Sequence, residues 1–78
     1  MTAFTPVTTL EDLESLNSDE IIEGYMEGRN GDPEPGENRG RSCWHGWRNG
    51  MIDSGRMEKD AAAAELARLV VRGKRQAS

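Results

Sequence analysis

The sequence predicts an all-α fold, and three observations carry that prediction. Apolar residues recur at three- and four-residue spacing in four segments, helix-capping residues precede these segments, and no stretch alternates as a strand does. Seventy-eight residues with 35% hydrophobic content allow one domain (residues 1–78) with a thin core. We therefore expect a small helical hairpin with a proline- and glycine-rich loop, flanked by a short N-terminal helix and a longer C-terminal helix.

The first half of the chain is expected to begin with a flexible lead-in over residues 1–8, because proline and β-branched threonines disfavour helix. Thr8 followed by Glu11 is a capping box for a short helix through Leu16. Asn17 and the acids after it predict a second helix to about residue 29. The expected apolar stripe of this second helix consists of Ile21, Ile22, Tyr25 and Met26.

The second half begins after a loop over residues 30–41, which is rich in proline and glycine. Ser42 is predicted to cap a third helix to about residue 54, with Gly55 as its left-handed stop. A fourth helix is expected over about residues 57–72, ended by Gly73 and followed by a flexible basic tail over residues 74–78.

Two pairs of glycines stand four residues apart, each beside an aromatic residue. Residues four apart lie on one helix face, and glycine inside a helix costs about 0.5–1 kcal/mol relative to alanine. The favoured explanation is a close crossing of the two central helices, although room for a ligand or partner helix is the alternative. The predicted crossing residues are Gly24, Tyr25, Gly28, Gly46, Trp47 and Gly50.

Over about residues 18–54, the chain resembles the ribosome modulation factor family. The residues that carry the resemblance are Gly24, Tyr25, Gly28 and Gly31, then the proline loop, then Arg41, Ser42, Gly46, Trp47, Arg48 and Asp53. The family consists of very small bacterial proteins with two helices joined by an irregular linker. The resemblance implies docking on the small ribosomal subunit and the promotion of inactive ribosome dimers in stationary phase. A larger protein or ribonucleoprotein complex is therefore the expected partner, and the thin core makes a homodimer a further possibility.

The charge is divided unevenly between the two halves of the chain. Residues 1–40 sum to −8 and residues 41–78 sum to +4. Opposite-charge helices packing together explain this split as well as a partner does. If the basic half binds RNA phosphates, Arg41, Trp44 and Arg48 form the candidate patch, with Trp47 buried and Trp44 partly exposed.

The alternative function uses the acidic half as a mimic of nucleic acid. In this hypothesis the protein is a phage- or prophage-encoded inhibitor, of the anti-CRISPR or anti-restriction type, that blocks a nucleic-acid-binding complex. A solvated face that only keeps the chain soluble is the simpler explanation. The candidate acidic residues are Glu11, Asp12, Glu14, Asp19, Glu20, Glu23 and Glu27.

Catalysis, cofactors and metals are not expected. Cys43 and His45 are two apart, so they point in different directions on a helix, and no further Cys or His completes a zinc site. The sequence has neither a phosphate-binding loop nor a nucleotide fingerprint. A lone cysteine and the lack of a signal peptide or a long apolar run predict a cytoplasmic protein that does not enter the membrane.

Overall fold

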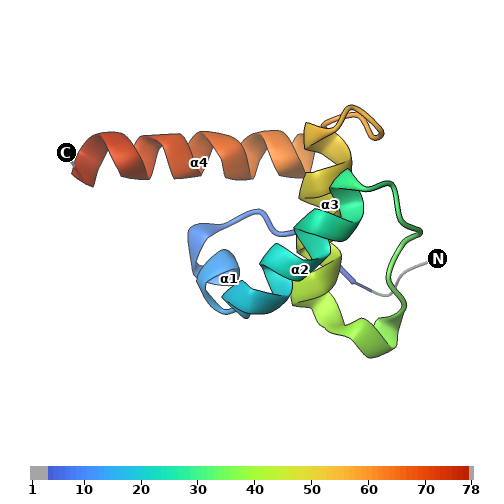
Figure 1. Cartoon of the computed structure of the whole chain (residues 1–78). Helices are drawn as coiled ribbons and strands as arrows, with labels where there is room; N and C mark the ends of the chain where they lie inside the picture. Colours follow the sequence, from blue (N-terminus) through green and yellow to red (C-terminus); the bar gives the residue numbers. More distant parts are fainter. Residues whose placement is uncertain (1–3, 78) are drawn as a thin grey trace.

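The computed structural model describes residues 4–77, with side chains described through residue 72, and its fold is all-α (Figure 1). A compact pair of helices, α2 and α3, carries the shorter α1 beside it, and α4 projects past the pair. No helix in the described part of the chain is long and apolar enough to cross a membrane. The elements are α1 (Leu10–Glu14), α2 (Ser18–Arg29), the 3-10 helix η1 (Glu37–Arg39), α3 (Gly40–Asp53) and α4 (Ala61–Ala77).

Side-chain caps start the first two helices. The Thr9 hydroxyl accepts a hydrogen bond from the Asp12 amide at 3.1 Å, so the cap of α1 is one residue later than the predicted Thr8. The Asn17 side chain accepts a hydrogen bond from the Glu20 amide at 3.0 Å and caps α2. Both acidic first turns lie at the positive end of a helix dipole.

The start of α3 differs from the prediction. Gly40, with φ of 86°, turns the chain from η1 directly into α3, two residues before Ser42. Ser42 does not cap this helix; its hydroxyl accepts a hydrogen bond from the Asn17 amide at 2.9 Å. The serine thus joins the start of α2 to the start of α3, a long-range role that local spacing does not reveal.

The limits of α4 also differ from the prediction. Asp60 caps this helix through the Ala63 amide at 2.9 Å, so α4 starts at Ala61 rather than near Met57. It continues through Gly73 to Ala77, so residues 74–77 are helical and not the expected tail; Ser78 lies outside the described residues. Glycine lowers helix propensity by only about 1 kcal/mol, which neighbouring residues outweigh here.

The lead-in is extended but packed against the body. Val7 is 3% exposed and belongs to the core. The Thr5 carbonyl accepts a hydrogen bond from Arg41 Nε at 2.9 Å, and the Phe4 ring lies 5.7 Å from the Trp44 ring. We expected a flexible lead-in over residues 1–8; residues 4–8 make these contacts with the body, while residues 1–3 lie outside the described part.

The core lies around α3, with α2 packed against it through glycine. Gly24 and Gly28 are buried, whereas Ile22 and Met26 of the predicted apolar stripe are 58% and 66% exposed. The prediction that Ile22 and Met26 face the core is wrong, because the glycines need the inner face for the crossing. The buried apolar residues are Val7, Cys43, Trp44, Trp47 and Leu66.

Candidate functional site

The four glycines lie where α2 and α3 cross, and each faces the backbone of the other helix. An added Cβ at Gly24 or Gly28 would overlap the carbonyl oxygen of Cys43 or Trp47. One at Gly46 or Gly50 would overlap the carbonyl oxygen of Ile21 or Tyr25. The overlap is with rigid backbone, so no rotamer change relieves it. The close approach leaves no space for a ligand between the two helices.

The helices α2 and α3 run in the same direction, start beside start, and polar contacts of the two aromatic residues fasten this pair. The Tyr25 hydroxyl donates to Asp53 Oδ2 at 2.7 Å and accepts from Arg29 Nη1 at 3.3 Å. Trp47 is 6% exposed, and its Nε1 donates to the Asp32 carbonyl at 2.8 Å. Trp47 therefore holds the connecting loop against the helix pair, so it is a structural residue and not an exposed contact.

Trp44 is buried rather than partly exposed. It is 4% exposed, its Nε1 donates to Glu34 at 2.8 Å, and the Arg48 guanidinium lies 5.0 Å from its ring centroid. Arg48, itself 9% exposed, also forms an ion pair with Asp60. The predicted stacking platform is thus occupied by the chain's own side chains.

Arg41 is engaged in a two-pronged contact with α1. Its Nη1 and Nη2 donate to the two carboxylate oxygens of Asp12 at 2.5 and 2.6 Å. These hydrogen bonds lower the pKa of the Asp12 carboxyl below its usual value, and the same contact raises the pKa of Arg41. The structure does bring Arg41, Trp44 and Arg48 onto one helix, but each has an internal partner.

The acidic candidates divide into paired and unpaired groups. Asp12 is held by Arg41, and Arg39 reaches Glu27 at 2.7 Å and Glu23 at 3.3 Å. Within the described part of the chain, the remaining four form no ion pair, and all are exposed. They are Glu11, Glu14, Asp19 and Glu20. An acidic surface at the α1–α2 corner is therefore more accessible than the predicted basic patch.

Cys43 and His45 are buried, and both sit in surroundings that favour the neutral form. Burial raises the pKa of the Cys43 thiol, which disfavours the reactive thiolate. Burial, Arg48 and Arg41 lower the pKa of His45, while Asp12 acts weakly in the opposite direction. Among the residues that the structure describes, no three potential ligands gather into a metal site.

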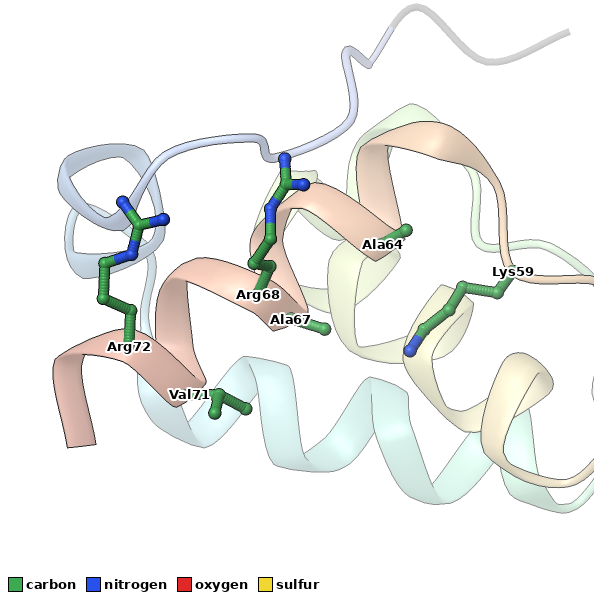
Figure 2. Close-up of a pocket in the computed structure, with 6 residues that line it drawn as sticks. All are labelled: Lys59, Ala64, Ala67, Arg68, Val71 and Arg72. Atoms are coloured by element: carbon green, nitrogen blue, oxygen red, sulfur yellow. The ribbon is translucent and has the colours of Figure 1, made fainter. Parts of the chain in front are cut away.

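A basic groove on α4 is a feature that the sequence analysis did not single out (Figure 2). It has a volume of about 480 Å³ and is lined by Lys59, Arg68 and Arg72 around a small apolar floor of Ala64, Ala67 and Val71. The guanidinium groups of Arg68 and Arg72 point the same way from successive turns, and Lys59 extends toward the helix from the preceding loop. The four-residue spacing of the two arginines was the available signal.

The fold and these contacts define a small all-α protein built on a glycine-packed helix pair. Comparisons with protein-family models, with curated proteins and with solved structures find no match for this chain.

Proposed function

We propose that this protein is a non-enzymatic regulatory binding protein that docks on a ribonucleoprotein partner, as its resemblance to ribosome modulation factor implies. One observation carries the proposal. The glycines and aromatics that make up the resemblance are also the residues at the α2–α3 crossing. The shared pattern thus coincides with the structural centre of the chain and not with scattered surface positions.

In this proposal the contact with RNA is made by α3, through Arg41 and Arg48. The two side chains are 25% and 11% exposed and are held by Asp12 and Asp60. Phosphate groups would have to replace these carboxylates as partners. Arginine binds carboxylate and phosphate through the same planar fork, which supports such an exchange.

A second candidate is favoured by the exposed acidic corner at α1 and α2. Here the protein is an acidic inhibitor that presents carboxylates to a cationic groove of a nucleic-acid-binding complex. Its supporting observation is that Glu11, Glu14, Asp19 and Glu20 are exposed and outside the ion pairs of the described residues, whereas Arg41 and Arg48 are engaged. Electrostatic complementarity of this kind steers association and selects partners.

Co-sedimentation with ribosomes at low salt separates the two candidates. Reversing the charge of Arg41 alone would leave Asp12 of α1 without its partner. The basic variant therefore neutralises both members of this pair, as Arg41→Gln with Asp12→Asn, and adds Arg48→Gln. The acidic variant is Glu11→Gln with Glu14→Gln and Glu20→Gln. Ribosome docking predicts that the basic variant loses binding and that the acidic variant retains it. Each lost phosphate contact should reduce the salt slope by about one.

The opposite pattern, or no co-sedimentation of the wild-type protein, would reject ribosome docking through α3. The matched comparison is the Asp12→Asn and Arg41→Gln pair without the Arg48 change, because it removes one of the two proposed phosphate contacts and should lower the salt slope by about one. Circular dichroism of every variant must match the wild type before binding is compared. Capture of a nucleic-acid-binding complex that depends on Glu11, Glu14 and Glu20 would support the inhibitor candidate.

A further inference from the structure

The large apolar side chains that are exposed in the described part of the chain lie on two helix faces. Ile22 and Met26 of α2 are 58% and 66% exposed, and Val71 of α4 is 50% exposed. Single exposed apolar residues need no explanation, but here each face also carries charge of one dominant sign. The two signs are opposite.

The first face is the outer side of α2, opposite its buried glycines. Ile22 and Met26 are one turn apart, and the exposed carboxylates of Asp19 and Glu23 lie beside them at helical spacing. Glu23 also contacts Arg39 at 3.3 Å, yet its side chain remains 66% exposed. We call these four residues the acidic face.

The second face is the basic groove of α4 shown in Figure 2. Val71 and two alanines form its floor, and Lys59, Arg68 and Arg72 form its rim. Arg68 pairs with Glu65 on the same helix, but its side chain is still 66% exposed. The helix α4 projects past the helix pair (Figure 1), and Arg68 and Arg72 of the groove are exposed.

We propose that the occupant of the basic groove is the acidic face of a second copy of this chain. Ile22 and Met26 would cover Val71 and the alanines, while Asp19 and Glu23 would meet Arg68, Arg72 and Lys59. No ion pair of the described residues joins the two faces within one chain. In a two-fold dimer the contact occurs twice, which doubles the buried area and satisfies both faces of both copies.

The charge pattern favours a second copy over nucleic acid as the occupant. A phosphate backbone would match the basic rim but leave the acidic face and its two exposed apolar side chains unused. A second copy uses both faces at once. A chain this small, with a thin core, also gains stability from association.

Sedimentation of the purified chain over a range of concentrations tests the proposal. The wild type should dimerise with rising concentration, and added salt should weaken the dimer because the pairs are exposed. Asp19→Lys with Glu23→Lys, and separately Arg68→Glu with Arg72→Glu, should each weaken self-association by at least about tenfold through like-charge repulsion. An equal mixture of these two variants should dimerise again, because one contact is then native and the other has both charges reversed.

Restored association in the mixture is the decisive result, because neither general destabilisation nor a change in net charge produces it. Glu37→Lys with Glu58→Lys is the matched control, since both carboxylates are exposed and lie outside the two faces. This control should dimerise like the wild type. A monomeric wild type at every concentration, or a mixture that stays monomeric, overturns the proposal. Binding of an RNA oligonucleotide by a monomer through Arg68 and Arg72 also overturns it.

Discussion

At the scale of single residues, His45 is the side chain whose surroundings constrain its chemistry most. It is 5% exposed, and its Nε2 lies 3.2 Å from the side-chain nitrogen of Asn49. In the tautomer that carries its proton on Nδ1, Nε2 accepts a hydrogen bond from this amide. Protonating Nε2 would set a buried imidazolium against Arg48 and Arg41, and the pKa of His45 is lowered accordingly.

The free energy of unfolding should therefore decrease as the pH falls below 6.5, the ordinary histidine pKa. Below pH 6.5 the histidine binds a proton in the unfolded chain, whereas in the folded chain it stays neutral until the pH reaches its lowered pKa. The free energy of unfolding therefore decreases between these two pKa values as the pH falls. Urea unfolding between about pH 8 and pH 5 measures this change. His45→Gln should flatten the dependence, because the chain has no other histidine. If the free energy of unfolding falls equally with pH in the wild type and in His45→Gln, the pH dependence does not come from His45.

At the scale of elements, the glycine crossing controls how α2 and α3 pack. In an open helix, glycine to alanine stabilises by about 0.5–1 kcal/mol. At Gly46 the new methyl group would overlap the Ile21 carbonyl, so Gly46→Ala should instead destabilise the fold by at least about 2 kcal/mol. Thermal melting gives the sign directly.

The control for this substitution is Ala61→Gly at the exposed start of α4, outside the basic groove. It should cost at most about 1 kcal/mol through helix propensity alone. If Gly46→Ala melts at or above the wild-type temperature, the helices do not approach as closely as described.

Sequence patterns predicted the elements better than their faces. Capping residues and proline placed the helices within a few residues, and glycine spacing pointed to the crossing. The inner face of α2 was missed, because hydrophobic periodicity selects Ile22 and Met26 while the crossing needs Gly24 and Gly28 inside. The burial of Trp44 was missed too, because partial exposure was predicted. Local spacing gave no sign that Glu34 would bind Trp44, because the two are joined across a loop.

At the scale of the whole molecule, stability depends on very few large side chains. Trp47 contributes the centre of the core and fixes the loop through Asp32. Trp47→Ala should cost about 3–5 kcal/mol, a large part of the 5–15 kcal/mol typical of a domain. Chemical denaturation should show a chain largely unfolded without denaturant. Trp47→Phe, which keeps most of the ring volume, should remain folded; native helix content in the alanine variant would contradict this account.

The glycine contacts also determine the register of α2 against α3. Each glycine Cα meets a carbonyl oxygen of the facing helix, so sliding one helix by a single residue would place a side chain where only a hydrogen fits. A slide of α2 against α3 by one residue therefore creates a backbone overlap at the crossing. Shear between α2 and α3, a common route of conformational adjustment in packed helices, is blocked. Any adaptation to a bound partner must therefore occur outside this joint, in the loops or in the angle at which α4 leaves it.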